Sequence, residues 1–226
     1  MGAVMDLFRV LFSPGEVFER VRERPKFLLP WIGLSIIIIL VAYMMMPFTQ
    51  AAIASRMAQI AQQNPQAAAN AAKFQTIGIA FAPIFLLIGL LISAGLLWLL
   101  VMLLGGADAK FKTLLSLSCY IAVPTILLQV AGLIVLKMKG VDAVTSPDDL
   151  RPPLGLNLLA PGTGGFVGAF LAGINPFSLW AMFLTAIGIQ VTHKTSKGAA
   201  YAVAIISTLL GVLIGSAFAG LGGGGK

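Results

Sequence analysis

Charged residues are scarce in this sequence. Only 10% of its 226 residues are Asp, Glu, Lys or Arg, whereas a soluble domain typically has about a quarter. Apolar residues make up 58% before glycine is counted, and the 25 glycines and 12 prolines stay below the share typical of disordered low-complexity chains. This composition excludes an ordinary water-soluble globule and predicts an integral membrane protein.

Cysteine and histidine occur once each, as Cys119 and His193. A single cysteine cannot form an intrachain disulfide, and one cysteine with one histidine cannot build a multi-Cys/His metal site. The chain also lacks a Gly-Lys-Ser/Thr phosphate loop, and its 15 basic residues are spread along the sequence rather than gathered in one patch. We therefore expect no metal, no cofactor and no nucleic-acid partner.

Several uncharged runs are long and apolar enough to cross a bilayer, since about 20 helical residues cover the roughly 30 Å hydrocarbon core. The runs are continuous and do not alternate with the period of two expected of a membrane β-barrel. The sequence therefore predicts an all-α fold, an integral membrane bundle of five transmembrane helices within residues 28–219. The predicted spans are residues 28–48, 76–104, 114–136, 176–191 and 199–219.

The predicted spans contain no Asp, Glu, Lys, Arg or His. Proton relays, ion-coupled transporters and intramembrane proteases usually have such groups inside a span, because they are costly in lipid and persist only for function. We therefore predict no enzyme activity and no catalytic residue. Gln129, in the third span, is the costliest polar side chain to bury, and it is our candidate for a polar core position.

The basic residues favour one orientation in the membrane, because Lys and Arg in short segments beside the spans concentrate on the cytoplasmic side. With a cytoplasmic N-terminus, nine of the 15 basic residues lie on that side. This pattern predicts a multi-pass protein of the plasma (inner) membrane whose C-terminus lies on the opposite side. The nine residues are Arg9, Arg20, Arg22, Arg24, Lys26, Lys110, Lys112, Lys194 and Lys197.

Residues 1–27 form a predicted cytoplasmic segment with an amphipathic interfacial helix. Ser13 is a suitable N-cap, Pro14 suits the first helical position, and Glu16 completes the pattern of a capping box. Such a helix would lie in the headgroup region of the bilayer. Its apolar side would consist of Val17, Phe18 and Val21.

The basic side chains of this helix are candidate contacts for lipid or for a partner protein. Each basic residue near anionic headgroups contributes about 1 kcal/mol of attraction, which neighbouring acids offset in part. The simpler alternative is a juxtamembrane helix that only orients the first span. The candidate contact residues are Phe18, Arg20, Arg22, Arg24 and Lys26.

Two segments between the spans are predicted to be irregular. Residues 56–73 are rich in Ala, Gln and Asn around Asn64-Pro65, which predicts a polar loop with helical turns. Residues 137–175 are rich in proline and glycine. Within them, residues 154–172 contain apolar stretches too short to cross the bilayer, so they are interfacial or re-entrant.

The last span carries small residues at every fourth position, which would let another backbone approach closely within the bundle or in an oligomer. A glycine-rich tail, residues 220–226, is predicted to be flexible. We expect the bilayer and other membrane proteins, or a second copy of the chain, to be the partners. The predicted helix-packing residues are Ser207, Gly211, Gly215 and Ala219.

The stretches 11–18 and 24–26, ahead of the first span, and 175–180, 187–189 and 197–199, around the fourth, resemble the bacterial members of the Yip1 family. The resemblance covers most of the chain. It implies a five-span bundle with a cytoplasmic N-terminus and a role as a membrane-organising or trafficking-like scaffold. Eukaryotic relatives are associated with vesicle trafficking and small GTPases, but this chain lacks their long cytosolic region. The family pattern supplies no catalytic residues.

Three hypotheses for the function follow. The first is a non-enzymatic scaffold that organises the membrane or binds partners through its N-terminal helix and the small-residue face of its last span. The second is a permease or transporter component, in which Gln129 and kinks at Pro83 and Pro124 line a path for a neutral substrate. The third is an accessory subunit of a larger membrane complex.

Overall fold

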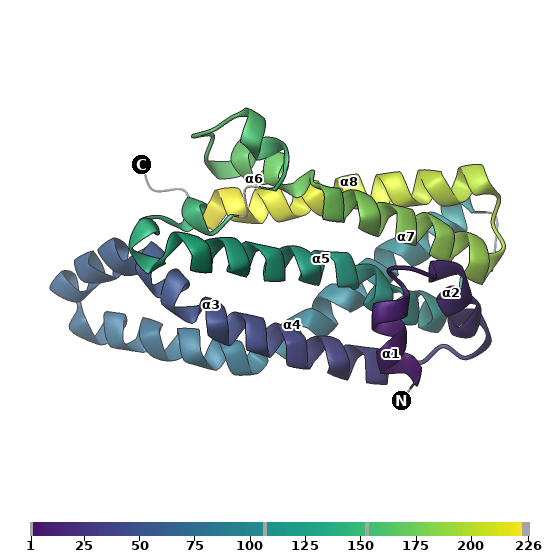
Figure 1. Ribbon diagram of the computed structural model, residues 1–226, viewed down its shortest axis with the longest axis horizontal. Helices are drawn as coiled ribbons and strands as arrows, with labels where there is room; N and C mark the ends of the chain where they lie inside the picture. The colour runs from purple at the N-terminus through teal and green to yellow at the C-terminus, as the bar shows by residue number, and fades with distance from the viewer. Residues whose placement is uncertain (1, 106–107, 152–153, 223–226) are drawn as a thin grey trace.

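The computed structural model describes residues 2–105, 108–151 and 154–222, and these residues contain helices but no strand. The long helices run side by side along the long axis of the molecule, while α1 and α2 cover one end, which we call the α2 end (Figure 1). The long helices are α3 (Leu28–Gln63), α4 (Pro65–Leu104), α5 (Phe111–Lys139), α7 (Pro176–His193) and α8 (Lys197–Gly222). The shorter elements are α1 (Gly2–Arg9), α2 (Pro14–Glu23), η1 (Val141–Ala143), η2 (Pro147–Leu150), η3 (Leu156–Leu159) and α6 (Gly165–Gly173).

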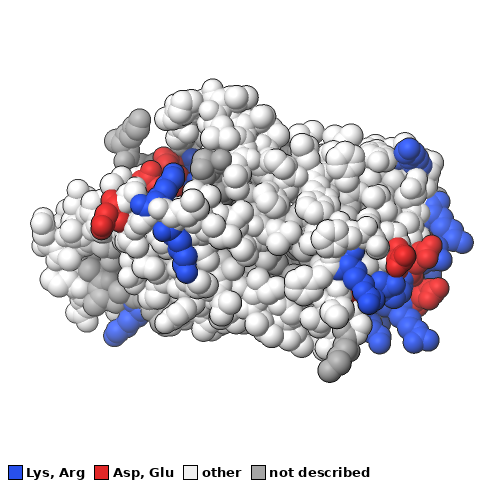
Figure 2. All heavy atoms as spheres, in the orientation of Figure 1, with Lys and Arg blue, Asp and Glu red and all other residues white. Residues whose placement is uncertain are grey.

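The predicted all-α membrane bundle is confirmed. By length and hydropathy, α3, α4, α5 and α8 can each cross a bilayer, and α6 with α7 forms a fifth crossing if that pair, bent by 56°, is one broken span. Figure 2 shows charged side chains grouped at the two ends of the molecule, with a wide uncharged belt between them on the face drawn. An uncharged belt of this kind is the surface that a bilayer covers.

The prediction of a polar loop at residues 56–73 is wrong, because this segment is helical on both sides of Asn64. Helix α3 continues to Gln63, and α4 begins at Pro65 after Asn64, whose side chain accepts a hydrogen bond from the Ala67 N–H (3.0 Å). Ala and Gln are strong helix formers. At about 1.5 Å per residue, α3 and α4 are roughly 54 and 60 Å long, so this helical hairpin extends well beyond a hydrocarbon core of about 30 Å.

The segment between α5 and α7 packs against the bundle. The 3-10 helix η2 lies against α3, and the Asp149 carboxylate accepts hydrogen bonds from the backbone N–H groups of Thr145 (2.9 Å) and Ser146 (2.8 Å). These bonds hold the pKa of Asp149 below its usual value. Within residues 154–172, α6 packs along α8, close enough that a Cβ on Gly173 would lie 2.7 Å from Val212.

The largest core cluster lies towards the α2 end and joins residues of α1 and α2 to those of the long helices. Beside this cluster α5 packs against α7 at Gly188, where an added Cβ would overlap the fully buried Leu117 side chain. Glycine therefore lets the two helices approach each other, as small residues do in membrane bundles.

We expect the substitution Gly188→Val to destabilise the bundle by about 1–3 kcal/mol, because the added methyl groups would force α5 and α7 apart. The measurement is the thermal unfolding midpoint of the purified protein in detergent. Combining it with Leu117→Ala should recover part of the loss, since the smaller side chain makes room. The control is Gly211→Val, where a Cβ would meet no atom within 4 Å. Equal destabilisation by the two valine variants would contradict the prediction.

Candidate functional site

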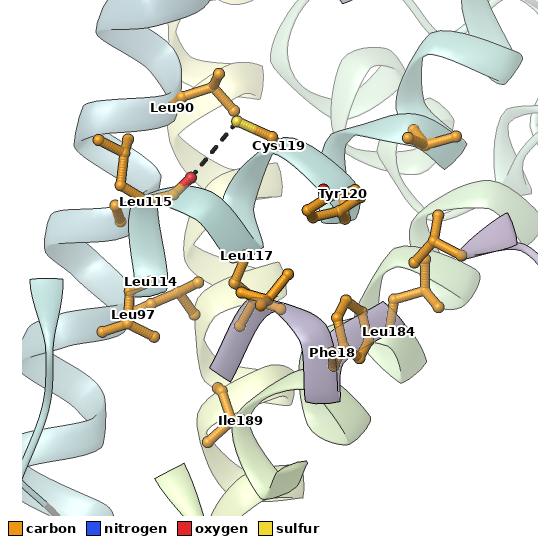
Figure 3. Packing of buried hydrophobic residues seen from close by; sticks show 14 of the residues in the cluster. Phe18, Leu90, Leu97, Leu114, Leu115, Leu117, Cys119, Tyr120, Leu184 and Ile189 are labelled. Carbon is orange, nitrogen blue, oxygen red and sulfur yellow. Dashed lines mark hydrogen bonds between the residues drawn. The ribbon is translucent and has the colours of Figure 1, made fainter. Parts of the chain in front are cut away.

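The predicted amphipathic helix exists as α2, but its apolar side faces the protein and not the headgroups. Val17 and Phe18 are fully buried and Val21 is 3% exposed. Figure 3 shows the Phe18 ring near Leu117 of α5 and Leu184 of α7. Phe18 is therefore not a lipid or partner contact, and this part of the prediction is corrected. Ser13 is the N-cap residue of α2 as expected, but its side chain makes no capping hydrogen bond.

Helix α1, which we did not predict from the sequence, fixes α2 in place through an ion pair. The Arg20 guanidinium donates from Nη2 to Asp6 Oδ1 at 2.8 Å and from Nε to Asp6 Oδ2 at 3.2 Å. Asp6 is only 6% exposed. The hydrogen bond to Asp6 raises the pKa of Arg20 above its already high ordinary value. Arg20, predicted as a contact residue, therefore joins the two short helices into one unit, the α1–α2 cap (residues 2–23).

The remaining predicted contact residues, Arg22, Arg24 and Lys26, are exposed at the α2 end. Figure 2 shows blue side chains gathered at this end of the molecule. Arg22 Nη1 lies 3.4 Å from the Val191 carbonyl oxygen, so its side chain lies against the end of α7. The chain beyond α2 is held on α5, because the Ser116 hydroxyl donates to the Lys26 carbonyl at 3.1 Å.

A cleft of about 380 Å³ opens between α1, the end of α2 and the start of α3. It brings together three of the predicted contact residues, Arg20, Arg24 and Lys26, with the acidic residues Asp6 and Glu23. Sequence reasoning could not have found this cleft, because one of its walls is α1. The other lining residues are Gly2, Ala3, Val21, Leu29 and Tyr120.

Gln129 is not in a polar core, which corrects the prediction for this residue. Its side chain is exposed and lines a hollow of about 360 Å³ between α3, α4 and α5. Residues of α3 on this hollow include Met45, Met46 and Thr49. A run of apolar residues does not specify which side of a helix faces its neighbours, so the sequence could not show that Gln129 points away from the core.

Two of the four small residues of the last span, Gly211 and Gly215, have no packing partner within the described part of the chain. Gly211 and Gly215 are exposed, and a Cβ added to either would meet no atom within 4 Å. With Ser207 they line a cavity of about 540 Å³ between α4, α5, α7 and α8. Ala219, the fourth member, is half-buried. The prediction that these small residues pack inside the bundle is therefore wrong for the two glycines. Their packing against another chain stays a prediction.

Comparison with known proteins agrees with this architecture. The family model described as "Yip1 domain" matches residues 8–219, a range that contains all of α2 and the long helices up to the last turn of α8. The chain is 33% identical over 225 residues to a Bacillus subtilis (strain 168) protein named "Membrane protein YknW", covering 95% of this chain and 90% of that relative. No solved structure matches the chain significantly. The chain is an all-α membrane bundle and matches this domain over nearly its whole length, so it belongs to the Yip1 family.

Proposed function

We propose that this protein is a non-enzymatic multi-pass membrane scaffold that binds partner proteins through the α2 end of the bundle. The observation that carries the proposal is helix α2, whose apolar side is buried in the core while Arg22 on this helix and Arg24 and Lys26 just after it stay exposed. A charged surface held on a rigid base suits recognition by contact, because the partner does not have to order it.

We also propose that the α2 end faces the cytoplasm and that the membrane is the plasma membrane. The α1–α2 cap, the link from α2 to α3 (residues 24–27), the segment that leads into α5 (residues 108–112) and the turn from α7 to α8 (residues 194–197) lie at this end (Figure 1). These segments carry the nine basic residues counted above, and an excess of Lys and Arg is typical of the cytoplasmic side. Five crossings would place the end of α8 on the opposite side.

The test is co-isolation of partner proteins from native membranes, followed by mass spectrometry. The variant is Arg22→Glu with Arg24→Glu, because these exposed side chains can be reversed without disturbing the ion pair of Arg20 and Asp6. We expect the variant to lose its co-isolated partners by at least about tenfold, since reversing rim charges opposes association.

The matched control is Lys137→Glu with Lys139→Glu, which makes the same change of charge on exposed residues at the end of α5 that lies away from the α2 end. This control should keep the partners. An unchanged set of co-isolated proteins in the Arg22 and Arg24 variant would count against the proposal. If the partners retained by the wild-type chain form one stable assembly, the protein is an accessory subunit of that complex.

The permease hypothesis has less support. Its predicted path required Gln129, but the larger cavity is lined by Thr125 on α5, while Gln129 lines the separate hollow against α3 and α4. Pro124 is buried, and Pro83 lies within the continuous helix α4. The backbone carbonyl of Pro83 accepts a hydrogen bond from Trp31 Nε1 (3.1 Å). These residues do not converge on one route through the bundle.

A further inference from the structure

We propose that the cleft between α1, α2 and the start of α3 binds the phosphate headgroup of an anionic phospholipid. This inference rests on the same α2 end of the molecule as the proposed function, and it names the chemistry that one part of that end recognises. The cleft has a volume of about 380 Å³, which is within the range of roughly 300–1,000 Å³ typical of small-molecule sites.

The charges around the cleft favour an anion. Arg20 neutralises Asp6 at 2.8 Å, so that acid does not oppose a bound phosphate. Among the residues that the structure describes, no carboxylate lies within 4.0 Å of Arg24 or Lys26. Both cations therefore remain available to a phosphate oxygen, with Glu23 the one acid on the cleft outside the ion pair.

The edge of the cleft that the start of α3 forms is continuous with the surface that the bilayer covers. Leu29 lines the cleft and is 44% exposed at the first turn of α3. An exposed apolar row continues from there along the same helix, in a segment apolar enough to span the membrane. A lipid with its phosphate in the cleft could therefore lay its acyl chains on this row, which a water-soluble phosphopeptide could not do. The row consists of Leu28, Leu29, Ile32 and Ile36.

Helix α1 gives a second, independent indication that the cleft lies at headgroup depth. Met5 and Phe8 on α1 are 58% and 61% exposed, and Phe12 in the turn that follows is 83% exposed, although α1 is anchored by the buried Leu7. Large apolar side chains held outside the core beside the start of a span are typical of an interfacial helix whose apolar face enters the headgroup boundary. The α1 wall of the cleft would then lie among the headgroups themselves.

The cleft is also preorganised for binding. The ion pair of Asp6 and Arg20 fixes α1 to α2 across it, and the Ser116 hydroxyl holds the backbone of Lys26 at 3.1 Å. Tyr120 closes its inner side, with its hydroxyl 3.5 Å from the Ala3 carbonyl oxygen. Preorganised cations lose little conformational entropy when a ligand binds.

The test measures lipid binding by the purified full chain in detergent, without any partner protein. Phosphatidylglycerol, phosphatidylcholine or soluble glycerol 3-phosphate is added, and the bound ligand is quantified by native mass spectrometry together with the thermal unfolding midpoint. The variant is Arg24→Gln with Lys26→Gln, and the control is Lys194→Gln with Lys197→Gln, which removes the same charge from the turn between α7 and α8. Arg24→Lys keeps the charge.

We expect the wild type to retain and be stabilised by phosphatidylglycerol in preference to phosphatidylcholine. The affinity for phosphatidylglycerol should fall about 25-fold in the Arg24 and Lys26 variant, because each basic residue near an anionic headgroup contributes a factor of roughly five. The control and Arg24→Lys should bind as the wild type does. All variants should unfold at the wild-type temperature without lipid, since the replaced side chains are exposed.

Three results would overturn the inference. They are equal binding of the two lipids, an equal loss of affinity in the control variant, and binding of glycerol 3-phosphate as tight as that of the lipid, which would make the site one for a soluble phosphate. Co-isolation of partners separates this inference from the proposed function. If the wild type retains partner proteins but not phosphatidylglycerol, the lipid site is wrong and the scaffold role stands. If it retains phosphatidylglycerol but no partner protein, the scaffold role is wrong and the lipid site stands.

Discussion

Replacing Phe18 with alanine should release the α1–α2 cap from the bundle while the long helices stay associated. Phe18 is among the largest fully buried side chains of the described residues, and it lies where α2 meets α5 and α7. Phenylalanine-to-alanine changes in a packed core typically cost about 3–5 kcal/mol. A helix of 10 residues has little stability of its own, so a loss of this size should fall on the docking of the cap.

Limited trypsin digestion in detergent measures this release, because the bonds after Arg20 and Arg22 become cleavable when α2 undocks. We expect cleavage there to be at least about 100-fold faster in Phe18→Ala than in the wild type. The matched control is Phe12→Ala, the same change at a position that is 83% exposed, and its cleavage rate should be unchanged. Equal rates in the Phe18 variant and the wild type would show that the cap does not depend on this contact.

Reversing the charge of Arg20 should loosen the contact between α1 and α2. The substitution Arg20→Glu would place a carboxylate beside Asp6, which is 6% exposed and would lose its bidentate partner. Breaking a fully buried ion pair costs about 3–5 kcal/mol, but the Arg20 side chain is 44% exposed, so solvent screening reduces our expectation to about 1–2 kcal/mol. The loss should separate α1 from α2.

A charge swap tests the pair directly. Asp6→Arg combined with Arg20→Glu should recover part of the stability that either substitution removes, which a double-mutant cycle measures from unfolding midpoints. Arg22→Glu is the control, because Arg22 makes a single exposed contact with the Val191 carbonyl. Strict additivity of the two substitutions would mean that Asp6 and Arg20 do not interact, and that α1 is held by its apolar contacts alone.

The spans were predictable from sequence because they depend on composition. The backbone N–H and C=O groups of an uncharged run such as 114–136 can be hydrogen-bonded in lipid only if the run forms a helix. In the structure this run lies within α5. The α2 helix was predictable from Pro14 and the spacing of its apolar residues, but not its burial. Whether an amphipathic face packs on lipid or on protein depends on tertiary contacts, here with Leu117 and Leu184, that local periodicity does not contain.

Three features were missed for separate physical reasons. Helix α1 has 8 residues, and the ion pair that anchors it joins positions 14 apart in the sequence. Residues 56–73 were too polar to be read as part of a span, although their alanines and glutamines favour a helix once α3 and α4 support it. The outward direction of Gln129 and of Gly211 depends on how the helices are rotated in the bundle, which uniformly apolar runs leave open.

Because the hairpin of α3 and α4 is long, this protein extends farther from the membrane on the side of the hairpin turn than on the other side. Twelve residues of α4, or roughly 18 Å of helix at about 1.5 Å per residue, precede Ile77, where its membrane-compatible stretch begins. Asn64 and Pro65 at the turn therefore stand in water, clear of the lipid surface. A molecule that diffuses along that side of the membrane would touch this tip before it could reach the shorter α5, α7 or α8.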